Sequence, residues 1–170
     1  KKNLFYLSIP VFFSNSAIPL VGMVDTGLMG NLEESKFLAA TSIATAVMTM
    51  IIWSFGFLRM GTVGIVSQLY GKSDYREISR TLLRNFLISI IASVAIILLQ
   101  NYIISLTNYF FSISNETQEL VETYISVRVH SIPAEFVTYI LVGFYFGIQK
   151  TNISSLIIII ISALNIILSS

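Results

Sequence analysis

Long apolar runs separated by short polar segments dominate the pattern along the chain. Runs of this kind are expected to form membrane-spanning helices once they reach about 20 residues. Because the runs are continuous rather than alternating, and lipid obliges each segment to satisfy its own backbone, the pattern favours helices over a β-barrel. The predicted spans cover about residues 3–31, 37–70, 80–110, 117–149 and 151–170.

Composition and charge support the same class. The 170 residues are 55% hydrophobic and only 11% charged, whereas soluble domains carry roughly 25% charged residues. The net charge of +1 gives no indication of nucleic-acid binding, and the lack of cysteine excludes disulfides and thiolate metal sites. We therefore expect an all-α integral membrane protein that contacts membrane lipid, binds no nucleic acid and carries no metal or organic cofactor.

The basic residues between the spans predict the orientation. The Lys1–Lys2 pair precedes the first span, four basic residues in segment 72–84 follow the second, and Lys150 follows the fourth. All of them lie on one side if the spans alternate, and the opposite side, with segments 33–36 and 116–119, carries mainly glutamate. The positive-inside rule then predicts a multi-pass protein of the cell (inner) membrane with a cytoplasmic N-terminus.

Within segment 72–84, three arginines recur every fourth residue. Arg76, Arg80 and Arg84 therefore share one stripe if this segment is helical. We expect this stripe at the lipid headgroups and regard a phosphate-binding site as the less favoured interpretation.

Ionisable residues inside the apolar runs are functional candidates, because a charge at bilayer depth costs about 2.5–3.5 kcal/mol on insertion scales. The candidates are Asp25, Arg59, Arg128, His130 and Glu135. For Arg59 the favoured interpretation is structural, since a long arginine can bridge helices or extend to the interface. His130 is interpreted as an interhelical hydrogen-bond donor rather than a proton relay. Glu135 is a second candidate for an ion or proton site.

Asp25 is the most specific candidate. It lies alone in a long apolar stretch, and Gly22 and Gly27 nearby would let a partner or water approach closely. Desolvation favours the protonated form of a buried carboxyl, so such a residue could exchange a proton or a cation. The structural alternative is an ion pair with Arg59 or Arg128.

Two prolines lie in the same predicted span as Asp25. Pro10 and Pro19 each remove a backbone donor and can bend a helix. Pro10 could instead mark the helix start, where proline is common, but this objection does not apply to Pro19. We therefore interpret the span as a helix that can bend and move. In the last span, Asn165 is an isolated amide that could join helices or bind a cation.

Four motifs in this order resemble a known family. They read "IPLVGMVDTGLMG", "FGFLRMGTVGIVSQLYG", "SIPAEFVTYILVGFYFGIQKT" and "ALNII". The series is similar to the N-terminal part of multidrug and toxic compound extrusion (MATE) transporters, in the DinF-like branch. The chain starts at Lys1 and stops at Ser170 inside an apolar run, so we expect it to be a portion of such a protein.

The resemblance implies a fold of twelve helices in two six-helix lobes, of which this chain would supply about five helices of the first lobe. It implies efflux of cationic or amphipathic small molecules by antiport against protons or sodium ions, with the remaining lobe required. The coupling carboxylate of the family corresponds to Asp25, which could also bind sodium, and the helix hinge corresponds to Pro10. Asn165 matches a family asparagine, but Ser169 stands where many members carry aspartate.

Three alternatives remain open from the sequence. A flippase for lipid-linked precursors, from the same superfamily, would show a more cationic cleft, and Arg59 and Arg128 are compatible with it. An intramembrane enzyme is disfavoured, because no serine–histidine pair or metal-ligand spacing is present, although Asp25 and Glu135 could form a carboxylate pair if they met. A third alternative is a transporter fragment that has no activity alone.

Overall fold

The computed structural model describes residues 35–111 and 115–169, and these residues are helical apart from short turns, with no β-strand among them. Asp25, Pro10 and Pro19 lie outside the described residues. The elements are α2 (Ser35–Ser54), α3 (Phe57–Gly71), α4 (Tyr75–Leu98), α5 (Gln100–Phe111), α6 (Asn115–Arg128), the 3₁₀ helix η1 (Val129–Ser131), α7 (Ile132–Gly147) and α8 (Thr151–Ser169).

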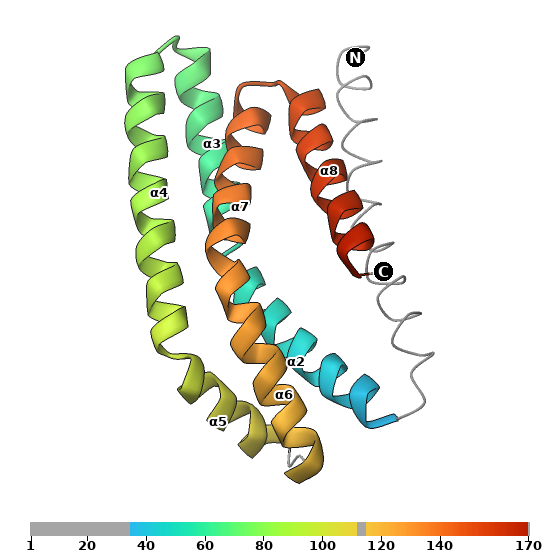
Figure 1. Cartoon of the computed structure of the whole chain (residues 1–170). Helices are drawn as coiled ribbons and strands as arrows, with labels where there is room; N and C mark the ends of the chain where they lie inside the picture. The colour runs from blue at the N-terminus through green and yellow to red at the C-terminus, as the bar shows by residue number, and fades with distance from the viewer. Residues whose placement is uncertain (1–34, 112–114, 170) are drawn as a thin grey trace.

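Three segments of the described chain are long and apolar enough to cross a membrane. They are Phe37–Gly71, Tyr75–Leu98 and Thr117–Gly147, and a shorter apolar helix covers Thr151–Ile161. The first segment combines α2 with α3 across a turn, and the third combines α6 with α7 through η1, so the regular α-helix is interrupted once in each; we call these two interruptions breaks (Figure 1). The prediction of an all-α membrane protein is confirmed.

Each break has a local cause. Between α2 and α3 the amide of Gly56 donates to the carbonyl of Trp53 over 2.9 Å, which tightens the chain into a three-residue turn. Between α6 and α7, Pro133 occupies the first turn of α7, where its missing N–H is tolerated. In the preceding η1 the helix tightens to 3₁₀ form, because the amide of Ile132 donates to the carbonyl of Val129, three residues back.

Two tight turns join neighbouring helices and have the same form. In the turn from α3 to α4, Ser73 adopts a left-handed conformation with φ of 58°, and Gln149 does the same between α7 and α8 with φ of 62°. In each turn the following amide reaches back five residues, from Asp74 to the carbonyl of Leu69 in one case. These bonds satisfy the free carbonyls at the ends of α3 and α7.

The helices pack in two regions. In one, α2 lies along α6 through the buried side chains of Ala44, Met48 and Ile125. In the other, α7 lies between α3, α4 and α8 and packs most extensively against α3 (Figure 1).

Two glycines bring the backbones of α3 and α7 together. A Cβ atom added at Gly143 would lie 2.8 Å from the carbonyl oxygen of Arg59, and one at Gly147 would lie 2.7 Å from Cβ of Val66. The spacing of four residues places both glycines on one face of α7, as in the small-residue interfaces typical of membrane helices.

Candidate functional site

The predicted coupling residues fall largely outside the described part of the chain. Asp25 and the two prolines of the first span, Pro10 and Pro19, are not described. Asn165 lies on α8, but only its backbone is described. The site that the structure does describe is formed by the other predicted residues, around the break between α6 and α7.

Arg128 and Glu135 form an ion pair across this break. Nη2 of Arg128 lies 3.3 Å from Oε1 of Glu135, although the two residues are seven positions apart. The hydroxyl of Ser131, in η1 between them, lies 3.1 Å from the same carboxylate oxygen and 2.8 Å from the carbonyl oxygen of Arg128. Both charged side chains are partly exposed, so the pair spans the break and remains accessible.

The polar side chains continue along α7 toward α3. Tyr139 lies one helical turn after Glu135, on the same face of α7. The guanidinium carbon of Arg59 lies 5.3 Å from the ring centre of Phe146, a cation–π contact between α3 and α7. We call Arg128, Glu135, Tyr139 and Arg59 the polar row.

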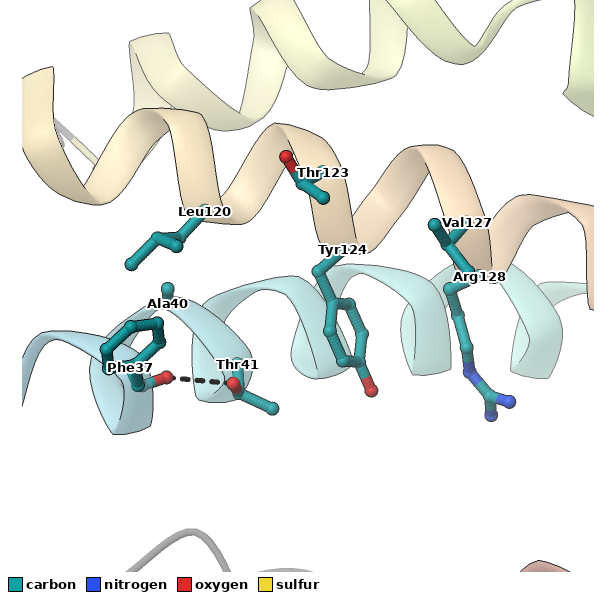
Figure 2. Close-up of a pocket in the computed structure, with 8 residues that line it drawn as sticks. All are labelled: Phe37, Ala40, Thr41, Leu120, Thr123, Tyr124, Val127 and Arg128. Atoms are coloured by element: carbon teal, nitrogen blue, oxygen red, sulfur yellow. Dashed lines mark hydrogen bonds between the residues drawn. The ribbon is translucent and has the colours of Figure 1, made fainter. Parts of the chain in front are cut away.

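A groove between α2 and α6 ends at the polar row. It has a volume of about 390 Å³, and Figure 2 shows Arg128 and Tyr124 extending toward the same side of the two helices. The hydroxyl of Tyr124 accepts a hydrogen bond of 3.2 Å from Thr45, which joins α6 to α2. The groove is lined by Phe37, Ala40, Thr41, Leu120, Thr123, Tyr124, Val127 and Arg128. It is therefore apolar for most of its length, with a cation at one end.

His130 differs from the sequence interpretation. Its Nδ1 lies 2.8 Å from the carbonyl oxygen of Ser126, and because a carbonyl can only accept, the imidazole donates this bond. Ser126 belongs to the preceding turn of the same segment, so this bond is local rather than interhelical. The side chain is exposed, and His130 is not a member of the polar row.

Sequence reasoning singled out three members of the polar row and missed Tyr139. The sequence did contain a signal for Tyr139, because a tyrosine four residues after a glutamate lies on the same face of a helix as that glutamate. Among the residues that the structure describes, no group of three or more histidine, cysteine, aspartate or glutamate side chains could hold a metal ion.

Comparison with known proteins places the chain in a family. The family model described as MatE matches residues 10–170. The chain belongs to the MatE family. It is 30% identical over 167 residues to DNA damage-inducible protein F of Escherichia coli strain K12, a match that covers 98% of this chain and 36% of that protein. It is 21% identical over 168 residues to the probable multidrug resistance protein NorM of Bacillus subtilis strain 168, covering 99% of this chain and 37% of the relative.

This MatE chain therefore spans little more than a third of the length of the curated relatives it matches. The likeness to DNA damage-inducible protein F agrees with the predicted DinF-like branch and N-terminal portion. The uncharacterized transporter YisQ of Bacillus subtilis strain 168 is 29% identical over 75 residues, covering 44% of this chain and 16% of that protein. No solved structure matches the chain.

Proposed function

We propose that this chain is part of a membrane transporter that exports cationic or amphipathic small molecules by antiport against protons or sodium ions. Membership of the MatE family carries the proposal, together with relatives named as multidrug resistance proteins. The ionisable polar row on apolar helices is consistent with it, since charges at bilayer depth mark substrate and ion pathways. Because relatives are nearly three times longer, transport requires the remaining lobe.

In this proposal Asp25 binds the coupling ion and Asn165 supplies a neutral ligand. Protonation or sodium binding at Asp25 changes its hydrogen bonds and favours a bend of the first span at Pro10 or Pro19. The bend favours release of the substrate, and departure of the ion resets the helix. The ion drives the change only through its different affinity for the two conformations. Ser169 leaves Asp25 without the second carboxylate that the resemblance leads one to expect.

The polar row adds a second charge switch in the proposed mechanism. In the described conformation Arg128 neutralises Glu135 across the break between α6 and α7. If a cation or a proton bound the carboxylate of Glu135, the ion pair would be lost. Arg128 would then be released toward the groove between α2 and α6. Because η1 and Pro133 already weaken helix continuity there, exchanging the partner of Glu135 would alter the angle between α6 and α7.

The coupling role of Asp25 is tested by Asp25→Asn in the full-length protein that carries this chain. Ethidium transport into everted membrane vesicles, which corresponds to efflux from the cell, is measured under an imposed proton gradient and, separately, a sodium gradient. We expect gradient-driven efflux to fall to background, because the amide cannot bind a proton or carry a charge. Glu119→Gln is the matched control, since Glu119 is an exposed acid on α6. Wild-type coupled efflux by Asp25→Asn would refute the mechanism.

The role of the ion pair is tested in the same vesicles by exchanging its charges. Glu135→Gln leaves Arg128 without this partner and is expected to reduce efflux. The double variant Arg128→Glu with Glu135→Arg restores opposite charges at the same separation and is expected to regain part of the activity. A double variant no better than the worse single variant would show that the pair does not act as a unit.

Orientation is a further part of the proposal. We place the N-terminus and the turn between α3 and α4 in the cytoplasm, in the inner membrane, on the distribution of basic residues. The chain has no cysteine, so a cysteine introduced at Ser73 or at Glu119 is the only thiol within these 170 residues when it is labelled in intact cells. A membrane-impermeant maleimide should label position 119 and leave position 73 unlabelled, and the reverse result would invert the topology.

One observation favours a second candidate substrate class. The polar row contains two arginines and one glutamate, and within the described residues Arg59 has no carboxylate in an ion pair with it. A surplus positive charge suits an anionic substrate such as a lipid-linked precursor better than an organic cation. Competition in vesicles between ethidium and a polyprenyl phosphate would separate the two classes. Inhibition by the lipid phosphate together with loss of that inhibition in Arg59→Gln would favour the flippase.

A further inference from the structure

Helix α4 has two faces of opposite character. The face toward α3 and α7 buries small polar side chains, including Ser89 and Ser93. The opposite face exposes large apolar side chains, with exposed fractions between 49% and 77%. These exposed side chains are Leu83, Leu87, Ile91, Val94 and Leu98. An apolar outer face of this length is suited to lipid rather than to water.

The three arginines recognised in the sequence lie on this same outer face. Arg76, Arg80 and Arg84 are exposed and follow one another at intervals of four residues on α4. At 3.6 residues per turn each step rotates by only about 40°, so the stripe runs almost along the helix axis. Continuing the same face past Arg84 leads to Leu87 and Ile91. The face is therefore basic at the start of the helix and apolar beyond it.

The acidic residues near the stripe are already committed to other contacts. Glu77 forms an ion pair with Arg80. Asp74 caps the helix, because its carboxylate accepts a hydrogen bond of 3.1 Å from the amide of Glu77. Within the described part of the chain, no ion pair involves Arg76 or Arg84. Among the described residues, Arg76 and Arg84 are therefore the two arginines of the stripe outside any ion pair.

We infer that the outer face of α4 is a binding site for an anionic glycerophospholipid. The phosphate would lie among Arg76, Arg80 and Arg84, where arginine can bind phosphate oxygens through two N–H groups at once. An acyl chain would run along the apolar part of the face. Ten residues from Arg84 to Val94 rise by about 15 Å, which is half the roughly 30 Å thickness of a bilayer hydrocarbon core. Headgroup and acyl chain are thus matched by consecutive parts of one helix face.

The inference is tested on the purified full chain in detergent by native mass spectrometry. Phosphatidylglycerol and phosphatidylcholine with the same acyl chains are titrated separately, and the dissociation constant of the first bound lipid is compared. We expect clear preference for phosphatidylglycerol, weakened about fivefold by Arg84→Gln or Arg76→Gln, because each basic side chain near anionic lipid contributes by a factor of about that size. Binding of phosphatidylcholine should weaken less, because its choline cation offsets the charge of its phosphate.

Lys150→Gln is the matched control, because it removes one exposed positive charge. Lys150 belongs to the turn between α7 and α8, which lies at the same end of the molecule as the turn between α3 and α4 (Figure 1). A phosphatidylglycerol with a photoreactive diazirine on its acyl chain should crosslink to α4 between Leu87 and Leu98. Three outcomes would each overturn the inference. They are equal dissociation constants for the two lipids, crosslinks confined to other helices, and a loss of phosphatidylglycerol affinity in Lys150→Gln as large as in the arginine variants. Full competition by glycerol 3-phosphate would also overturn it, by showing a site for free phosphate.

Discussion

The contact between α3 and α7 permits a sharp test, because the same short region contains glycines that are packed and glycines that are not. A Cβ at Gly147 would lie 2.7 Å from Val66, and one at Gly143 would lie 2.8 Å from a backbone oxygen of α3. Gly61 and Gly64, both on α3, have nothing within 4 Å of an added Cβ. All four are in helices and none has a positive φ, so alanine is conformationally allowed at each.

The expected magnitudes have opposite signs. Normal carbon contacts are about 3.5–4.0 Å, so Gly147→Ala must separate the helices by roughly 1 Å. Overpacking of this kind costs about 1–3 kcal/mol, and the higher helix propensity of alanine returns at most about 1 kcal/mol. We expect Gly147→Ala and Gly143→Ala to lower the free energy of unfolding by about 1–2 kcal/mol. Gly61→Ala and Gly64→Ala should raise it by up to about 1 kcal/mol.

Unfolding in mixed micelles with increasing SDS, followed by far-ultraviolet circular dichroism, gives these free energies. A compensating change distinguishes a steric clash from other effects. Val66→Gly should reduce the cost of Gly147→Ala, measured as the coupling between the two substitutions, because it removes both Cβ and Cγ1 of Val66, which lie 2.7 Å from the added methyl group. It should not rescue Gly143→Ala, where the contact is a backbone oxygen that no truncation removes. If Gly143→Ala were as stable as Gly64→Ala, the close approach of α3 and α7 would be refuted.

Two further predictions concern single positions. Thr62 accepts a hydrogen bond of 2.8 Å from the side-chain amide of Asn85, joining α3 to α4, so Thr62→Val should lower the free energy of unfolding by about 0.6–1.7 kcal/mol; an unchanged value in the same micelle assay would mean that the bond contributes nothing. Gln149→Gly should raise the free energy of unfolding by about 1 kcal/mol, because glycine adopts the left-handed conformation without a steric penalty. A destabilised variant would contradict the φ of 62° at this position.

The apolar runs indicated the helical class correctly, because continuous hydrophobicity over such lengths has few other solutions. They did not give the breaks. The sequence suggested one long run through residues 37–70, but the turn at Gly56 divides it into two helices. The fourth span was likewise predicted as continuous over residues 117–149, whereas η1 interrupts it just before Pro133.

The candidate site was predictable by residue type but not by pairing. Arg128, Glu135 and Arg59 were identified because charge is rare in apolar runs. Neighbours on one face of a regular helix are three or four residues apart, whereas Arg128 and Glu135 are seven apart and meet across a 3₁₀ turn. The placement of Arg59 over Phe146 joins two segments distant in sequence, and no local pattern specifies such a contact. The ionic role of Asp25 remains a prediction.

The buried polar face of α4 has a consequence for biogenesis. The hydroxyl of Ser93 donates to the carbonyl of Ser89 over 2.7 Å, and that of Ser89 donates to the carbonyl of Phe86. These groups are satisfied within the helix, so α4 can leave the translocon and enter lipid before any neighbour is present. Asn85 is different, because its amide finds its partner on α3. Synthesis of α3 before α4 makes that partner available at the moment when α4 inserts.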